Sequence, residues 1–190
     1  MGELIFILGG ARSGKTTYAQ RLAHEMAGDA VLFVATAEGR DEEMQERIAD
    51  HQQSRPAAWR TLEAARHVGK AIAEASGDQR VVLVDCMTLL VSNAILSLGD
   101  EPEAKAAEAA VRTEVAELLA AQRQSDAAFI VISNEVGLGL VPPYPLGRIY
   151  RDLLGMANQI LAAQAQRVYW MMAGVPVDIK ALQQAQAVRV

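Results

Sequence analysis

Near its N-terminus the chain reads Leu4-Ile5-Phe6-Ile7-Leu8-Gly9-Gly10-Ala11-Arg12-Ser13-Gly14-Lys15-Thr16. The apolar run 4–8 is typical of a buried β-strand, and residues 9–16 match the pattern G-x-x-x-x-G-K-[ST]. A helical pattern follows, with apolar side chains at Tyr18, Leu22 and Met26 and with Gly28 as its expected end. Because a strand precedes the motif and a helix follows it, the motif predicts a phosphate-binding loop rather than an incidental glycine turn.

The chemistry of phosphate binding accounts for the residue types in this loop. Glycines let the backbone curl so that successive N–H groups face phosphate oxygens, and the helix N-terminus adds a positive partial charge. Lys15 can reach the outer phosphates of a nucleoside triphosphate, and the Thr16 hydroxyl can ligate Mg²⁺. Asp85, directly after the apolar run 81–84, is the expected second Mg²⁺ ligand, with a turn-forming Asp before a helix as the alternative. The chain has no Asn-Lys-x-Asp motif, so the nucleotide base stays open.

Short apolar runs alternate with helical patterns along the rest of the chain. Strands are expected at residues 31–35, 81–84, 129–132 and 168–172, and helices at residues 41–53, 62–75, 89–98 and 103–124. Residues 174–179 are the expected edge strand, since an edge tolerates Pro176. Apolar strands separated by helices predict a three-layer α/β fold, in which helices cover both faces of a mostly parallel sheet.

Length and composition indicate an ordinary globular protein. The 190 residues suit a single domain over residues 1–190, and they are 51% hydrophobic and 22% charged. No apolar stretch approaches the roughly 20 residues of a membrane span, and the N-terminus lacks the basic flank of a signal peptide. The only cysteine, Cys86, cannot form an internal disulfide, so a cytoplasmic protein is expected. The net charge of −5 and the absence of a dense Lys/Arg run argue against nucleic acid as a partner.

The three histidines, His24, His51 and His67, show no metal-ligand spacing, so no zinc site is expected. His24 and His67 are interpreted as solvated or capping residues on helices. His51 lies in the segment that follows the second strand, which can hang over the triphosphate, where a neutral imidazole can attack phosphorus or act as a base. On the residues alone, a packed histidine that continues the apolar stripe of Met44 and Ile48 is the favoured interpretation.

A second glycine-rich segment, residues 133–139, directly follows the fourth expected strand. In open α/β sheets, ligands bind beyond the carboxyl ends of the strands. Glu135 can hold a hydroxyl group or a metal-bound water there, and a simple glycine-rich turn with a capping acid is the alternative.

Taken together, these segments resemble the bifunctional adenosylcobinamide kinase/adenosylcobinamide-phosphate guanylyltransferase family of cobalamin biosynthesis. The resemblance covers nearly the whole chain and rests on residues 9–16, Ala35-Thr36-Ala37, His51, Arg55-Pro56, Trp59, Thr61, Glu63, Asp85-Cys86, Thr88, Asn93, Asn134-Glu135-Val136-Gly137, Gly139, Val141-Pro142 and Asn158-Gln159. The phosphate loop is shared by many families. The patterns His-x-x-x-Arg-Pro-x-x-Trp and Asn-Glu-Val-Gly-x-Gly are far more specific.

The resemblance implies two reactions. One phosphorylates the aminopropanol hydroxyl of adenosylcobinamide with ATP or GTP, and the other transfers GMP from GTP to that phosphate through a guanylylated histidine at the position of His51. It also implies a P-loop NTPase fold of the RecA-like type, Mg²⁺ as cofactor and a homotrimer. The implied catalytic residues are His51 and Lys15, the implied metal ligands are Thr16 and Asp85, and the implied nucleotide contacts are Gly9, Gly10, Ala11, Arg12, Ser13, Gly14, Lys15, Thr16, Thr36, Ala37, Glu38, Gln52, Gln53, Ser54, Arg55, Glu63 and Asp85. Two departures stand out: Gln52 and Gln53 replace a residue that is often charged, and Asp85 stands where some relatives carry Glu.

Two alternatives make different predictions. A P-loop kinase for another small molecule, without nucleotidyl transfer, predicts γ-phosphate transfer and no covalent GMP adduct. A non-catalytic nucleotide switch of RecA type predicts slow hydrolysis and no acceptor substrate. Neither alternative needs the segment around His51 or the loop that contains Glu135.

Overall fold

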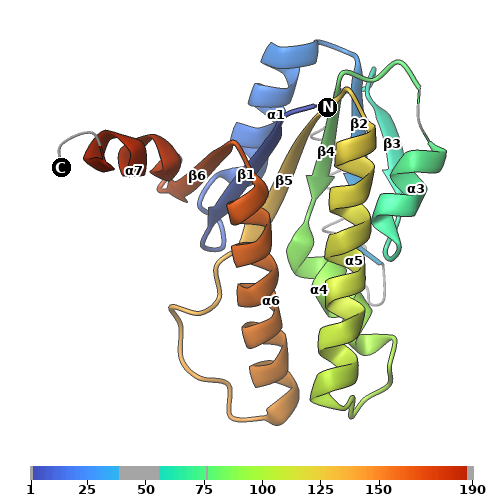
Figure 1. Cartoon of the computed structure of the whole chain (residues 1–190), viewed down its shortest axis with the longest axis vertical. Helices are drawn as coiled ribbons and strands as arrows, with labels where there is room; N and C mark the ends of the chain where they lie inside the picture. The colour runs from blue at the N-terminus through green and yellow to red at the C-terminus, as the bar shows by residue number, and fades with distance from the viewer. Residues whose placement is uncertain (1, 39–55, 76, 188–190) are drawn as a thin grey trace.

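A computed structural model describes residues 2–38, 56–75 and 77–187 of the chain (Figure 1). Its elements, in order, are β1 (Leu4–Gly9), α1 (Lys15–Ala27), β2 (Val31–Ala35), β3 (Arg60–Glu63), α3 (Val68–Glu74), β4 (Val81–Asp85), α4 (Met87–Leu96), α5 (Ala104–Gln124), β5 (Ala128–Asn134), α6 (Pro145–Gln164), β6 (Arg167–Met172), β7 (Val175–Asp178) and α7 (Ile179–Ala187). Among the described helices, none is both long enough and apolar enough to span a membrane.

The strands form one seven-stranded sheet in the order β3-β2-β4-β5-β1-β6-β7. All neighbouring pairs are parallel except β6 and β7, which are antiparallel. The mostly parallel sheet and the predicted edge strand are confirmed. Pro176 lies in β7, opposite Met171, on the outermost strand, where its missing N–H costs no ladder hydrogen bond on the open side.

Two hydrophobic cores lie between the sheet and the helix layers that cover its two faces. Alternate residues of β1 point to opposite faces, so Phe6 packs with residues of α3, α4, α5 and α6, while Ile5 and Ile7 pack with residues of α1. Figure 1 shows these helices around the sheet. The central strands are buried on both sides, which explains why they read as unbroken apolar runs. The predicted three-layer α/β fold is therefore confirmed.

Three details differ from the sequence-based expectations. The helix expected at residues 62–75 is wrong, because Arg60–Glu63 pairs with β2 as the edge strand β3 and the helix spans only Val68–Glu74. Most β3 side chains are exposed, so no apolar run announces the strand. Helices α6 and α7 were not predicted. On α1 the buried residues of the apolar face are Ala19, Ala23 and Ala27, while Tyr18, Leu22 and Met26 lie at the margin of the core. The helix expected at residues 41–53 lies outside the described residues.

Candidate active site

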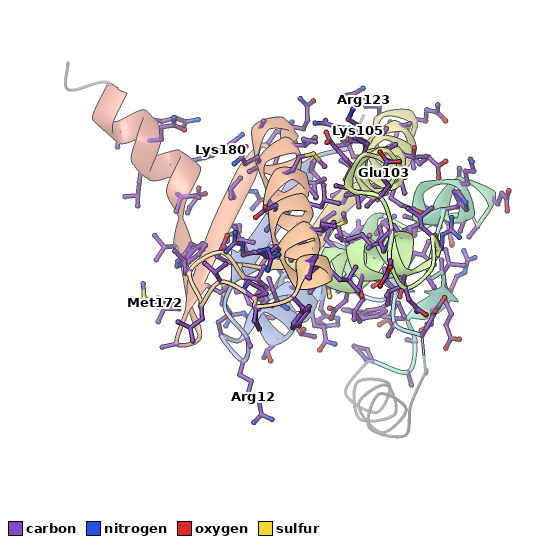
Figure 2. All side chains as sticks on the ribbon, turned by 90° about the horizontal axis from the view of Figure 1, so that it is seen from below. Arg12, Glu103, Lys105, Arg123, Met172 and Lys180 are labelled. Carbon is purple, nitrogen blue, oxygen red and sulfur yellow. The ribbon has the colours of Figure 1, made fainter. Side chains whose placement is uncertain are left out.

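The predicted phosphate loop connects β1 to α1 at the carboxyl edge of the sheet, where β2, β4 and β5 also end. Gly14 has a φ of 91°, a left-handed conformation that favours glycine. A Cβ atom on Gly14 would lie 3.1 Å from the Cα atom of Gly174, in the turn between β6 and β7. The Gly174 N–H also donates to the Ser13 carbonyl oxygen at 3.0 Å, so this turn packs directly on the loop. Arg12, at the tip of the loop, points away from the protein (Figure 2).

Lys15 folds back over the loop that it follows. It is a buried residue, and its ammonium group donates to the carbonyl oxygen of Gly10 at 2.6 Å and to Ser13 Oγ at 3.4 Å. Burial lowers the pKa of Lys15, and the nearby Cys86 and Asp85 only partly oppose this shift. The side chain therefore lies across the cradle in which a phosphate group would be held.

The two candidate Mg²⁺ ligands lie next to each other. Thr16 Oγ1 donates a hydrogen bond to Asp85 Oδ2 at 3.1 Å, and Asp85 is the last residue of β4. A hydroxyl and a carboxylate oxygen at this separation are hard oxygen donors of the kind that Mg²⁺ prefers. The residues present therefore fit the ion that the sequence predicts.

Thr36 and the residues after β2 continue the same edge. The Thr36 side chain is buried; its hydroxyl donates to the Cys86 carbonyl at 2.8 Å and accepts from the Cys86 N–H at 2.8 Å. Asn93, also buried, donates to the carbonyls of Thr36 at 2.8 Å and Ala65 at 3.1 Å. Asn93 had no predicted role, and Thr36 was predicted only to contact the nucleotide. In the structure, their hydrogen bonds join the ends of β2 and β4 to each other and to the segment just before α3.

The remaining predicted nucleotide contacts divide into two groups. Ala37 and Glu38 are half-buried directly after Thr36, and Glu63 ends β3 opposite Ala35. His51, Gln52, Gln53, Ser54 and Arg55 lie outside the described residues. Trp59, in the same specific motif as His51, is buried and donates its indole N–H to the Gly28 carbonyl at 3.1 Å. This contact fixes the chain just before β3 against the end of α1.

The loop after β5 begins beside the phosphate loop. Asn134 is paired in register with Gly9, and the Glu135 N–H donates to the Gly9 carbonyl at 3.1 Å. The Glu135 carboxylate accepts a hydrogen bond from the Gly137 N–H, so in this structure it caps its own turn. This contact favours the second of the two interpretations of Glu135.

A buried polar network holds the start of that loop. Ser133 Oγ donates to Asn158 Oδ1 at 2.6 Å, and Asn158 Nδ2 donates to the Asn134 carbonyl at 3.1 Å. The Asn134 N–H in turn donates to Thr88 Oγ1 at 3.0 Å. Helices α4 and α6 therefore fix the end of β5 by side-chain hydrogen bonds, a role for Thr88 and Asn158 that the sequence did not reveal.

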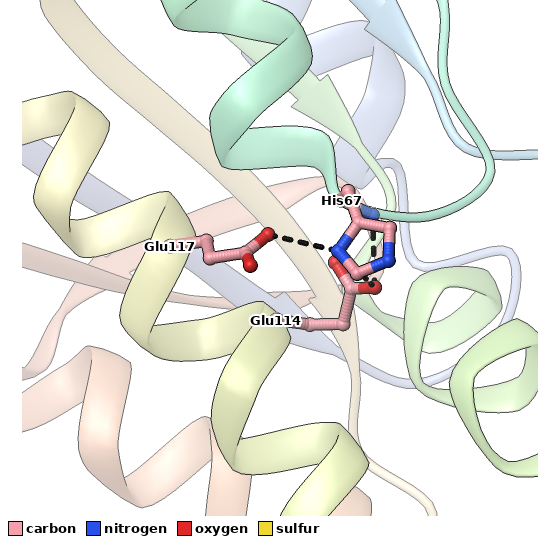
Figure 3. A group of neighbouring side chains, drawn as sticks. All are labelled: His67, Glu114 and Glu117. Atoms are coloured by element: carbon pink, nitrogen blue, oxygen red, sulfur yellow. Dashed lines mark hydrogen bonds and ion pairs between the residues drawn. The ribbon is translucent and has the colours of Figure 1, made fainter.

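One histidine cluster lies at the start of α3 and contains none of the predicted site residues. His67 precedes α3, and Nδ1 of its ring lies 3.2 Å from Glu117 Oε2, while its backbone N–H donates to Glu114 Oε1 at 2.8 Å (Figure 3). The sequence spacing did not foresee this grouping, in which ligand-type atoms lie within 4.8 Å of one another. Lys70 occupies the other oxygen of Glu117 at 2.7 Å. Burial raises the pKa of Glu117, but hydrogen bonds from Lys70 and His67 outweigh this effect and lower it. The same contacts join α3 to α5.

Comparison with known proteins identifies the family of this chain. Residues 5–179 match the family model described as cobinamide kinase/cobinamide phosphate guanyltransferase. The chain is 38% identical to the bifunctional adenosylcobalamin biosynthesis protein CobU of Escherichia coli (strain K12), covering 93% of this chain and 99% of the relative. It is 42% identical to the bifunctional adenosylcobalamin biosynthesis protein CobP of Pseudomonas aeruginosa, covering 92% of this chain and 95% of the relative.

Among solved structures, the chain is similar to the flagellar accessory protein FlaH from Methanocaldococcus jannaschii, with a TM-score of 0.48 at 16% identity over 92% of this chain and 75% of the other. It is similar to a solved ATPase domain with a TM-score of 0.49 at 14% identity, over 88% of this chain and 68% of the other. The family match and the identities of 38–42% across nearly the whole length carry the assignment. The chain belongs to the cobinamide kinase/cobinamide phosphate guanyltransferase family.

Proposed function

We propose that this bifunctional enzyme phosphorylates adenosylcobinamide and then transfers GMP from GTP to the new phosphate, giving adenosylcobinamide-GDP and pyrophosphate. Membership of the family over residues 5–179 supports both steps. The observation that carries the proposal is the grouping of Lys15, Thr16 and Asp85 around one loop, with Thr16 and Asp85 in direct hydrogen-bond contact. Residues 1–190 act as a single catalytic domain.

The nucleotide site takes GTP for guanylyl transfer and ATP or GTP as the phosphoryl donor. Its contacts are residues 9–16, Thr36, Ala37, Glu38, residues 52–55, Glu63 and Asp85. Thr16 and Asp85 hold Mg²⁺, which when bound neutralises charge on the phosphate oxygens. Lys15 stabilises the charge that develops on the departing phosphates. The buried setting of its ammonium group strengthens that interaction, because the local dielectric is low.

The two reactions differ in which phosphorus atom is attacked. In the kinase step the substrate hydroxyl oxygen attacks the γ-phosphorus, the nucleoside diphosphate leaves and the hydroxyl proton is released. In the second step a His51 ring nitrogen attacks the α-phosphorus of GTP and pyrophosphate leaves. A phosphate oxygen of the corrinoid then attacks the same phosphorus, the P–N bond breaks and His51 is regenerated. The position of His51 in the motif His-x-x-x-Arg-Pro-x-x-Trp supports this role.

The enzyme is proposed to work as a homotrimer in the cytoplasm. Support for association comes from exposed apolar side chains at the C-terminal end, where α7 extends away from the sheet (Figure 1). Ile179 and Leu182, three positions apart and thus on the same side of α7, are 41% and 54% exposed. A subunit contact would bury them. The trimeric number comes from the family resemblance.

The proposal is tested by measuring which labelled phosphate of GTP becomes attached to the protein. Protein is mixed with Mg²⁺ and GTP labelled at the α- or the γ-phosphate, denatured and assayed for retained label. Acid-labile α-label that is absent in His51→Ala and present in His24→Ala, a matched change at an exposed histidine of α1, is the expected result. Good GTP binding without α-label would instead favour a P-loop kinase that performs no nucleotidyl transfer.

A further inference from the structure

The segment between β5 and α6 exposes an unusual concentration of large apolar side chains. Leu138 is 83% exposed, Leu140 97%, Val141 64% and Tyr144 60%. We call these four residues the apolar ledge. Large exposed apolar patches on soluble proteins mark binding surfaces, and removing apolar side chains from water under a ligand lowers the free energy.

The segment that carries the apolar ledge leaves the sheet beside the candidate nucleotide site. Its segment leaves the sheet at Asn134, which is in register with Gly9, and the next residue, Glu135, is hydrogen-bonded to the Gly9 carbonyl at 3.1 Å. Gly9 is the first residue of the phosphate loop. The ledge therefore begins three residues along the chain from a backbone contact with the loop that is proposed to hold the triphosphate.

The ledge is held in place at both ends. The network of Thr88, Asn134 and Asn158 fixes its start. At its far end, the guanidinium of Arg148 donates to the carbonyls of Pro142 at 3.0 Å and Pro143 at 2.9 Å. Because the backbone is already fixed, ligand binding does not incur the full entropic cost of ordering a free loop.

The ledge is also free of charge. Residues 136–147 contain no Asp, Glu, Lys or Arg, in a chain that is 22% charged. Gly139 has only one atom within 4 Å of a built Cβ position, at 3.8 Å, so its backbone is open to a neighbouring molecule. The surface thus offers apolar side chains together with accessible peptide groups, and no ionic partner.

We propose that the apolar ledge is the docking surface for the corrin macrocycle of the cobinamide substrate. This inference rests on the proposed function, in which both reactions use a cobinamide as acceptor. A cobinamide carries a broad macrocycle whose faces and rim methyl groups are apolar and whose amide side chains are uncharged, which matches the ledge. The acceptor group must reach the phosphate loop, and the segment that carries the ledge is hydrogen-bonded to that loop at Gly9.

The test separates docking from nucleotide chemistry. The double variant Leu138→Ser/Leu140→Ser is compared with Leu98→Ser, a control at another exposed leucine that is 44% exposed. The KM for adenosylcobinamide phosphate in guanylyl transfer is expected to rise about tenfold or more in the double variant. Guanylylation of the enzyme by GTP alone, the KM for GTP and the oligomeric mass are expected to stay unchanged. The control is expected to match the parent protein in every measurement.

Two results would overturn the inference. One is an unchanged corrinoid KM in the double variant. The other is a smaller oligomeric mass in light scattering with no corrinoid effect beyond that loss, which would make the ledge a contact between copies of this chain. Equilibrium dialysis of adenosylcobinamide against the parent and double-variant proteins tests docking without any reaction. If the parent protein formed no guanylyl adduct, the proposed function would fail, and the dialysis would still decide on the ledge.

Discussion

Lys15 is the residue on which both proposed reactions depend, because each needs a triphosphate held at the same loop. Its buried ammonium group is hydrogen-bonded to the loop itself at Gly10. Lys15→Ala is expected to lower kcat/KM of both reactions by at least about 100-fold, as for the loss of a transition-state charge contact. Lys105→Ala, at an exposed position on α5, is the control. Steady-state kinetics with labelled GTP measure both, and turnover retained by Lys15→Ala would contradict the assigned role.

Glu114 acts on stability rather than on chemistry. It is 2% exposed and accepts hydrogen bonds from the backbone N–H groups of His67 at 2.8 Å and Val68 at 3.4 Å, where α3 has no side-chain cap of its own. Glu114→Ala leaves two amides without an acceptor and is expected to cost about 1–3 kcal/mol of unfolding free energy.

Urea denaturation measures that cost, with Glu108→Ala on the same helix as the control. The Glu108 side chain is 43% exposed and pairs with Arg112, so its removal is expected to change stability by less than about 0.5 kcal/mol. Equal midpoints for the two variants would show that the buried carboxylate does not cap α3.

Among single residues, the sequence predicts those that a local sequence pattern marks. Lys15 and Thr16 follow from the motif, and Asp85 follows from its place after an apolar run. The partners of Glu114 and Thr36 are 46 to 50 positions away, so no local pattern shows them. His51 had a functional role only through the family resemblance, since its surroundings alone favoured a packed histidine.

At the level of elements, side chains of α4 and α6 hold the start of the loop that follows β5. In Asn158→Ala, the fully buried hydroxyl of Ser133 loses its acceptor and the Asn134 carbonyl loses its donor. We expect a loss of about 2–3 kcal/mol in unfolding free energy and a lower kcat, because the loop that starts at Glu135 is no longer held. Gln159→Ala, the next position and exposed, should match the parent. A kcat and midpoint unchanged in Asn158→Ala would rule out this positioning role.

Most of the strands that the sequence predicts are buried on both faces. Strands β1, β2, β4 and β5 appear as apolar runs because helices cover both sides of the sheet. Strand β3 does not, because it lies at the edge with mostly exposed side chains and takes its strand conformation from pairing with β2. The end of β3 was therefore predicted as the start of a helix over residues 62–75, whereas that helix begins only at Val68.

For the whole molecule, the exposed C-terminal helix makes the proposed association testable. Leu182→Glu places a charge on the apolar side of α7, at a residue that is 54% exposed in the single chain. Burial of an unpaired carboxylate in a subunit contact is unfavourable, so the variant is expected to shift from trimer to monomer in light scattering. Gln183→Glu, an exposed change on the same helix, should leave the mass unchanged. A parent protein that is already monomeric would contradict the trimer.

The turn that carries this helix is also part of the phosphate loop's surroundings. Gly174 is hydrogen-bonded to Ser13, and the chain continues from that turn through β7 into α7. A movement of Ser13 when a triphosphate enters would act on this hydrogen bond, and so on the turn that leads through β7 to α7. Nucleotide affinity and subunit affinity are then thermodynamically linked, and each must change the other by the same factor. In the proposed oligomer, dilution of the enzyme would therefore alter how tightly it holds GTP.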